Sequence, residues 1–328
     1  MTNQIEHITI DNFKSLKHCE LTGCKRINLF IGRPNVGKSN ILEALSIFSL
    51  PFLKENSSKK ITHFIRVENE AELFYNGNYE QPIVVNTNVG KGTISYERKT
   101  GLEVLINTVS GGGKYVVDDK LNFRFGKNEE YLPFIRKYTF LASTNFKKAH
   151  SRYLIPPYGF NLLNVIERYP ELKEEISNLF TQYDLSLVFD KASQSLKIMQ
   201  PNKNKKDIFL VPYNSIADTL QRIIFFKTAI ASNHDAVLLF EEPEAHSFPP
   251  FISHITQEMI HKSDNQYFVA THSPFILNDL LENSREELAV FMFSYKSHQT
   301  TIRRLSGDEL HEIYQNGVDL FTNEESYI

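Results

Sequence analysis

The chain of 328 residues is 41% hydrophobic and 23% charged, a composition typical of a globular protein with a large core in one or two domains. Its formal net charge of -3 excludes a globally basic, nucleic-acid-binding protein but leaves room for a local basic patch. Met1–His7 lacks a secretion signal, and no uncharged apolar run approaches the ~20 residues of a membrane helix. We therefore expect a cytoplasmic protein without membrane contact. Its two cysteines, Cys19 and Cys24, are expected to be ordinary reduced thiols.

The N-terminal region predicts a β-hairpin followed by a buried strand and a helix. Apolar and polar residues alternate over 5–10, and 13–17 continues that pattern toward a second strand. Residues 26–31 form a short apolar run that is typical of a buried strand. Residues 40–48 carry apolar side chains at helical spacing, with no proline or glycine before Pro51.

Between that strand and that helix lies Gly32-Arg33-Pro34-Asn35-Val36-Gly37-Lys38-Ser39, which fits the phosphate-binding pattern G-x-x-x-x-G-K-S. In such a loop the backbone N–H groups turn inward around the β- and γ-phosphates, and glycines permit the close approach. Lys38 would add a positive charge there, and the Ser39 hydroxyl would be a ligand of Mg2+. The sequence thus predicts a site for a nucleotide with Mg2+, with these nucleotide-binding residues: Gly32, Asn35, Gly37, Lys38, Ser39 and Asn40.

From Glu70 to Phe125 the pattern favours short β-strands, which predicts an antiparallel layer beside the nucleotide-binding core. We expect strands at 71–75, 82–86, 93–96 and 102–106, and turns at 76–78, 90–92 and 111–113. A further strand is expected at 137–142, helical structure from Ala149 to Phe180 with a break at Pro156–Pro157, and strands at 185–189, 196–199 and 208–211. We divide the chain into an N-terminal part of the core at 1–148, a helical insertion at 149–185 and a C-terminal part at 186–328.

From Asp218 to Tyr295 helices and strands alternate, which predicts a parallel sheet with crossover helices. The apolar strand 236–240 ends in Glu241-Glu242-Pro243-Glu244, at the carboxyl edge where ligands bind in open α/β sheets. One of these carboxylates can hold Mg2+ through water, and the next can orient or deprotonate the attacking water. An acidic loop after a buried strand is common, so this expectation depends on the phosphate-binding loop upstream.

The next buried strand, 266–270, is followed by Thr271-His272-Ser273-Pro274. A lone histidine is usually structural. Because His272 follows the strand next in sequence to the acids, we expect it to hydrogen-bond the γ-phosphate.

Three blocks, 31–40, 239–245 and 270–274, together resemble the ABC-type ATPase heads of the RecF, SMC and OLD group. The opening segment 8–15 is similar to the way such heads begin. The resemblance implies an α/β fold with a P-loop core of mostly parallel sheet, an antiparallel β layer and a helical subdomain. It also implies the Walker B role for Glu241, the catalytic glutamate role for Glu242 and the switch histidine role for His272.

The chain departs from this family pattern at three places. Glu241 stands where an aspartate is usual, and Ser247-Phe248-Pro249 stands where Leu-His-Pro often follows the acids. No glycine occurs between Gly159 and Gly307, so the signature loop is matched best by 214–218. There Ser215 would reach the γ-phosphate bound to a partner head, while Ala217 replaces a glycine. The Q-loop is not assigned.

The resemblance implies an ATPase that binds ATP with Mg2+ and controls a partner protein by ATP-gated assembly. We expect slow hydrolysis and at least a homodimer, which ATP tightens. Stand-alone heads of this kind are frequent in bacterial anti-phage systems, where a separate effector protein acts. One alternative is a DNA-maintenance ATPase, with candidate DNA contacts at Lys147, Lys148, His150, Arg152, Tyr153 and Tyr158. Another is an ATP-gated scaffold that does not hydrolyse ATP. The region after His272 has no paired aspartates, so we expect no fused nuclease.

A GTPase is the remaining alternative. The run Asn204-Lys205-Lys206-Asp207 matches the guanine-reading pattern N-K-x-D. However, none of the 14 glycines has an aspartate three residues before it, so the D-x-x-G element of such proteins is absent. The lysine-rich run 202–207 is better interpreted as a solvated turn.

Overall fold

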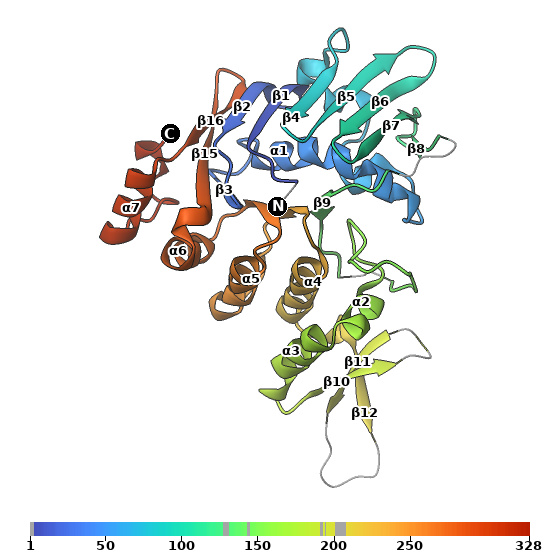
Figure 1. Ribbon diagram of the computed structural model, residues 1–328, viewed down its shortest axis with the longest axis vertical. Helices are drawn as coiled ribbons and strands as arrows, with labels where there is room; N and C mark the ends of the chain where they lie inside the picture. The colour runs from blue at the N-terminus through green and yellow to red at the C-terminus, as the bar shows by residue number, and fades with distance from the viewer. Residues whose placement is uncertain (1–2, 127–130, 143–144, 191–192, 194, 201–207) are drawn as a thin grey trace. The chain divides into compact units, whose positions relative to one another are not determined.

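The computed structural model describes residues 3–126, 131–142, 145–190, 193, 195–200 and 208–328 (Figure 1). The chain forms two compact units. Unit 1 comprises Met1–Lys137, Asp235–Glu242 and Ser263–Ile328, and unit 2 comprises Tyr138–His234 and Pro243–Lys262. Each unit is thus assembled from separate chain segments, whereas the division predicted from the sequence has three contiguous parts.

The centre of unit 1 is a six-stranded sheet in the order β16-β15-β3-β14-β13-β9. Its strands are β3 (Ile27–Ile31), β9 (Ile135–Tyr138), β13 (Val237–Glu241), β14 (Gln266–Ala270), β15 (Leu288–Lys296) and β16 (Gln299–Arg304). Strands β15, β3, β14 and β13 pair in parallel, and β16 pairs antiparallel to β15. All residues of β3 and β14 are buried, as expected for parallel strands covered on both faces. The predicted mostly parallel core is confirmed.

The second sheet of unit 1 is antiparallel, in the order β2-β1-β4-β5-β6-β7-β8. Its strands are β1 (His7–Phe13), β2 (Leu16–Thr22), β4 (Ile83–Thr87), β5 (Gly90–Glu97), β6 (Gly101–Thr108), β7 (Gly111–Val117) and β8 (Phe123–Arg124). The predicted N-terminal hairpin and antiparallel layer are therefore confirmed. Figure 1 shows both sheets with helix α1 (Lys38–Leu45), which packs against β1 of one sheet and β13 and β14 of the other.

Three local predictions in this layer were wrong. Residues 71–75 form parts of two 3-10 helices, η3 (Glu70–Leu73) and η4 (Tyr75–Gly77), because the Asn69 side chain caps the Ala71 N–H. Residues 90–92 and 111–113, both expected as turns, instead begin strands β5 and β7. A Cβ at Gly112 would collide with the Ile106 carbonyl oxygen of β6, so the close strand approach explains that glycine.

The remaining helices of unit 1 follow the phosphate-binding loop or the C-terminal strands. They are η1 (Ser46–Lys54), η2 (Ile61–His63), α6 (Pro274–Asn283), η6 (Arg285–Glu287), α7 (Gly307–Asn316) and η7 (Glu324–Ser326). Ser306 and Glu309 form a capping box at the start of α7, and Gly317, with φ of 62°, ends it. Cys19 and Cys24 are free and buried, and burial raises their pKa values to about 11 and about 12, as expected for unreactive thiols.

Unit 2 contains a helical group and a small antiparallel sheet. The helices are α2 (Leu162–Arg168), α3 (Pro170–Thr181), η5 (Tyr213–Ser215), α4 (Asp218–Ser232) and α5 (Pro249–His261), and α4 contacts α2, α3 and α5. The sheet consists of β10 (Ser186–Asp190), β11 (Ser195–Gln200) and β12 (Phe209–Pro212), as predicted. The helix expected from Ala149 begins only at Leu162, because the Asn161 side chain bonds the backbone of Tyr153 and Ile155 and fixes a loop there. Among the helices of the described residues, none combines the length and apolar character needed to cross a membrane.

We expect Phe30→Ala to lower the free energy of unfolding by about 3–5 kcal/mol, the usual cost of removing a buried aromatic side chain. Phe30 is fully buried in β3, and its ring centroid lies 5.9 Å from those of Phe268 and Phe291 and 5.0 Å from that of Phe293. Urea denaturation measures the loss. The control Tyr295→Ala removes a side chain that is 48% exposed and should change stability by about 0.5 kcal/mol at most. Equal losses in the two variants would contradict the packing described.

Candidate functional site

A cavity of about 550 Å³ in unit 1 collects residues from the three predicted motifs. The loop after β3, the acidic end of β13 and the end of β14 all contribute to it. The lining residues are Pro34, Asn35, Gly37, Lys38, Ser39, Asn40, Arg66, Glu241, Glu242, Ala270 and His272. The structure therefore brings together all but two of the predicted site residues. Gly32 lies beside them in the loop, whereas Ser215 is an exposed residue of unit 2.

The backbone of the phosphate-binding loop requires glycine at both ends. Gly32 has φ of 152° and Gly37 has φ of 103°. A Cβ at Gly32 would collide with the Phe293 carbonyl oxygen, and one at Gly37 would collide with the Thr300 hydroxyl. Asn35, with φ of 62°, also adopts the left-handed conformation that asparagine tolerates. The loop therefore keeps its curvature only with these residue types.

Lys38 is curled inside this loop. Its Nζ donates hydrogen bonds to the carbonyl oxygens of Gly32 at 2.7 Å and Arg33 at 2.8 Å, and the residue is only 6% exposed. Burial lowers the pKa of Lys38 to about 8, against the attraction of Glu242, Glu324 and Glu241. An anion in the loop would give this partly desolvated ammonium group a strong partner.

Ser39 and Asn40 form the first turn of α1, directly after Gly37. Ser39 is half-buried at the cavity wall. Asn40 donates from Nδ2 to the Ser15 hydroxyl at 2.7 Å, and the Ser15 and Thr300 hydroxyls are 2.7 Å apart. These bonds join the start of α1 to the β1–β2 turn and to β16, and so fix the direction in which the helix N-terminus points.

Glu242 and His272 face each other at the ends of β13 and β14. The Glu242 N–H donates to the Ala270 carbonyl at 2.8 Å, and its φ of 44° turns the chain away from the sheet. His272 Nε2 lies 3.6 Å from Glu242 Oε1. Burial and the charge of Lys38 lower the pKa of His272 below its usual 6.5, although Glu242 and Glu324 oppose this. The imidazole is therefore neutral at neutral pH.

Glu241 is held by cations that the sequence did not indicate. Arg66 donates from Nη2 to Glu241 at 2.8 Å and from Nε to Glu43 at 2.7 Å. The Lys137 ammonium group lies 3.9 Å from the other oxygen of Glu241. The sequence contained a signal for two of these residues. Glu43 is a carboxylate inside the apolar helix expected at 40–48, and Lys137 is a lysine within an expected strand. Arg66 lies in an irregular loop, where no motif or hydrophobic periodicity singles it out.

The residues present fit a magnesium ion. The Ser39 hydroxyl and the Glu241 carboxylate are oxygen donors on the wall of one cavity. Mg2+ is usually bound through one or two carboxylates with phosphates and water completing the shell. The described residues contain no group of three or more His, Cys, Asp or Glu that could hold a metal ion.

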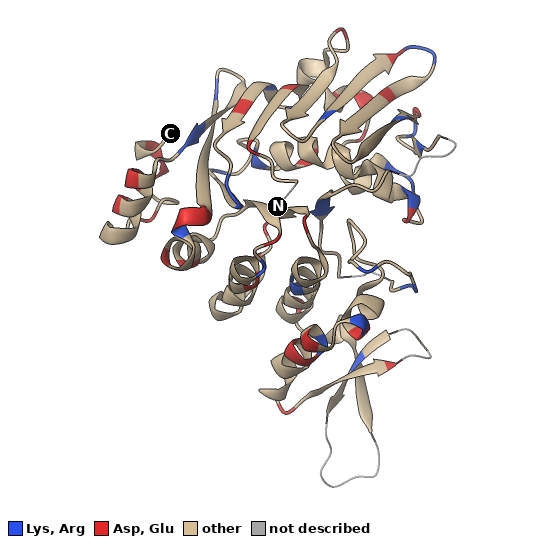
Figure 2. Ribbon diagram, in the orientation of Figure 1, with Lys and Arg blue, Asp and Glu red and all other residues tan. Residues whose placement is uncertain are grey.

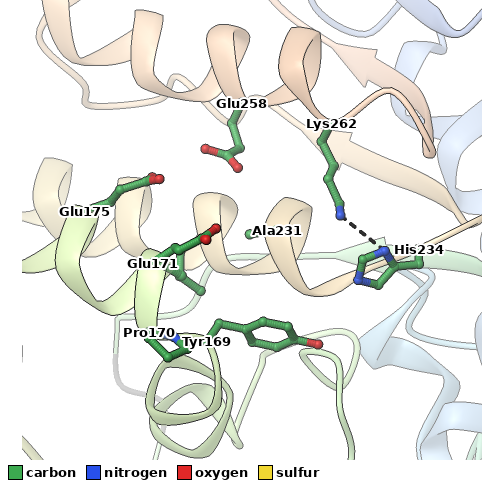
Figure 3. Close-up of a pocket in the computed structure, with 9 residues that line it drawn as sticks. Tyr169, Pro170, Glu171, Glu175, Ala231, His234, Glu258 and Lys262 are labelled. Carbon is green, nitrogen blue, oxygen red and sulfur yellow. Dashed lines mark hydrogen bonds between the residues drawn. The ribbon is translucent and has the colours of Figure 1, made fainter.

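A second cavity, of about 420 Å³, lies in unit 2 (Figure 3). Glu171 and Glu175 of α3 and Glu258 of α5 line it, together with Lys262, whose Nζ is 3.2 Å from His234 Nδ1. Lys227 forms ion pairs with Glu175 and Glu258. Two of these three carboxylates thus share the single positive charge of Lys227. Its lining includes none of the predicted nucleotide-binding residues.

The candidate DNA contacts Lys147, Lys148, His150 and Arg152 are exposed residues of unit 2. Figure 2 shows basic and acidic residues interspersed along the elements of both units. The guanine-reading match at 204–207 lies outside the described residues.

Comparison with known proteins agrees with the geometry. A protein of Helicobacter pylori (strain ATCC 700392 / 26695) named "ATP/GTP phosphatase" is 20% identical, with 97% of this chain and 100% of that protein covered.

Two solved structures show the same fold. An Smc head bound to the C-terminal winged-helix domain of ScpA matches 94% of this chain and 99% of its own, at 15% identity and a TM-score of 0.50. An Smc head with an extended coiled coil, bound to the C-terminal domain of ScpA derived from Pyrococcus furiosus, matches 95% and 98%, at 12% identity and the same TM-score. The expected fold of an SMC-type ATPase head is therefore confirmed.

The family itself is shown by a sequence match. The model of the AAA ATPase domain matches residues 4–191, which include the phosphate-binding loop and more than half of the chain. With the loop geometry and the fold, this match identifies the chain as a member of the AAA ATPase domain family.

Proposed function

We propose that this protein binds ATP with Mg2+ in the cavity of unit 1, hydrolyses it slowly, and uses the nucleotide to control its assembly with a partner protein. The observation that carries the proposal is the meeting of Lys38, Glu241, Glu242 and His272 at one cavity, although they come from three separate chain segments. A phosphate-binding loop alone would support binding. The added acids and histidine support hydrolysis.

In this proposal the loop N–H groups and Lys38 hold the phosphates, and Ser39 and Glu241 hold Mg2+. The metal would neutralise negative charge on the phosphates. Asn40 contributes by fixing the start of α1, whose positive end faces the loop. Gly32, Asn35 and Gly37 act through the backbone, because their positive φ values turn the loop around the anion.

Glu242 is the proposed general base. Its side chain is half-exposed at the cavity, so water can reach it, and the His272 ring on the neighbouring strand limits where it can point. A neutral His272 can donate one ring N–H toward the γ-phosphate without adding a charge that would compete with Lys38. The two side chains thus divide the work of orienting water and phosphate.

The name of the Helicobacter pylori relative supports triphosphate hydrolysis but includes both ATP and GTP. We propose ATP because the D-x-x-G element of GTPases is missing from the sequence. Preference for GTP in a binding measurement would reverse this choice.

The proposal of a partner depends only on the similarity to solved Smc heads. The two Smc heads are bound to domains of ScpA, which supports a protein partner for this chain as well. We propose at least a homodimer in which Ser215 contacts the γ-phosphate held by the other copy, and a separate effector in anti-phage defence. The alternative of a DNA-maintenance ATPase relies on the exposed cations of 147–152.

The first prediction concerns Lys38→Ala. Because Lys38 is the main side-chain cation proposed at the phosphates, the variant should lose detectable binding of a fluorescent ATP analogue. Lys91→Ala, which removes an exposed lysine of β5, is the matched control and should bind normally. Unchanged affinity in Lys38→Ala would refute the phosphate site.

The second prediction separates binding from hydrolysis. Glu242→Gln keeps the shape of the side chain but removes the base, so turnover should fall by roughly 100-fold or more while ATP still binds. Phosphate release and analogue binding are measured on the same sample. If Glu241→Gln destroys turnover and Glu242→Gln does not, the two acids have the opposite roles. Wild-type protein that binds ATP but never hydrolyses it with any partner would support the scaffold alternative.

The third prediction concerns assembly. ATP favours a closed dimer only by its differential affinity for that state, and a shift from mostly open to mostly closed needs about 5.5 kcal/mol. Ala217 replaces the usual glycine beside Ser215, so some of the contact across the dimer should be lost. We therefore expect a dimer or larger assembly without nucleotide, which ATP tightens. Light scattering of wild type and Glu242→Gln, with and without ATP, tests this, and a nucleotide-free monomer would contradict it.

A further inference from the structure

We infer that Arg66 is a positioning residue for Glu241. Before the nucleotide binds, its guanidinium group occupies the Glu241 carboxylate that would hold the metal ion, and it must leave that carboxylate when the metal ion binds. The inference rests on the proposed nucleotide site and adds a residue to it that the motifs do not contain. Arg66 would act through Glu241, by setting when that carboxylate is available.

The geometry makes Arg66 a bridge between two carboxylates. Its Nη2 donates to Glu241 Oε1 at 2.8 Å, and its Nε donates to Glu43 Oε1 at 2.7 Å. The side chain also lines the cavity beside Ser39, the other proposed metal ligand. A guanidinium group therefore lies within hydrogen-bond distance of an oxygen that Mg2+ would need.

The charge balance around Glu241 points the same way. Two carboxylates, Glu43 and Glu241, are surrounded by Arg66, Lys137 and Lys14, and the last of these pairs with Glu43. The protein's own cations, Arg66 above all, therefore already offset negative charge that Glu241 would otherwise present to a divalent ion. A metal ion on Glu241 would also be repelled by Arg66 at that distance.

Of the two cations on Glu241, only Arg66 is free to leave. The Lys137 side chain is 5% exposed and its Nζ donates to the Phe64 carbonyl at 2.8 Å, so it is fixed. The Arg66 side chain is 65% exposed. Its backbone is anchored, because Lys14 Nζ donates to the Arg66 carbonyl at 2.7 Å. Because the guanidinium group is planar and rigid, it would leave Glu241 by turning as a whole about the exposed side-chain bonds, with Glu43 still paired with Lys14.

The test is the affinity of the ADP-bound protein for Mn2+, which stands in for Mg2+ and whose free form is counted by electron paramagnetic resonance. Arg66→Met removes the competing cation but keeps a long apolar stem. We expect Mn2+ to bind roughly two- to tenfold more tightly than in wild type, the range for a partly exposed, charge-assisted ion pair. In a Glu241→Gln background the same substitution should have no effect, because its target is gone.

Arg124→Met is the matched control, since Arg124 is also an exposed arginine of this unit that pairs with an acid, Asp118, but does not line the cavity. It should leave Mn2+ affinity unchanged. Equal or weaker Mn2+ binding in Arg66→Met that still binds ADP would overturn the inference, as would a gain that persists without Glu241. Wild-type protein that binds no ADP would overturn the proposed function, and the inference with it.

Discussion

The register of three parallel strands determines where everything else in the site can lie. Phe30 of β3 pairs with Ala270 of β14, and Ala270 pairs with Glu241 of β13. These three residues form one row across the sheet, at the carboxyl end of each strand. The phosphate-binding loop, Glu242 and His272 all begin within two residues of that row. A slip of one residue in either pairing would turn Glu241 to the opposite face of the sheet.

Helix α1 converts this row into a cavity by closing one side of it. The helix follows the loop immediately and packs against β13 and β14, so it carries Ser39 to the cavity wall and Glu43 into the protein interior. A fully buried carboxylate is costly unless it is paired. Lys14 and Arg66 pair with Glu43, and together with Lys137 they keep its pKa below its usual value against the effect of burial. The cations that stabilise the helix thereby also control the charge at Glu241.

Much of this arrangement could be predicted from the sequence, because the informative patterns are local. The loop residues 32–39, the acids after β13 and His272 each follow a buried strand, and parallel strands bring such positions to one edge. The cations on Glu241 could not be found in this way. Arg66 is 175 residues from Glu241 along the chain and lies in an irregular loop, so only the folded chain brings them together.

The errors in secondary structure have similarly specific causes. The segment 71–75 alternates like a strand, yet one side-chain cap at Asn69 was enough to favour a 3-10 helix. Glycines 111–113 usually indicate a turn, but here close contact between β6 and β7 requires one of them within a strand. Residues 149–155 were expected to be helical, but the Asn161 side chain bonds the backbone of Tyr153 and Ile155 into a loop. In each case a contact outside the local pattern decided the structure.

The central claim is that the cavity of unit 1 holds a nucleotide with its metal ion. A crystal structure with a non-hydrolysable ATP analogue and Mn2+, with the metal located by anomalous scattering, tests this most directly. We expect the phosphates in the loop 32–39 and one metal peak between the Ser39 hydroxyl and the Glu241 carboxylate. Nucleotide density elsewhere in the chain, or a metal peak away from both side chains, would contradict the account.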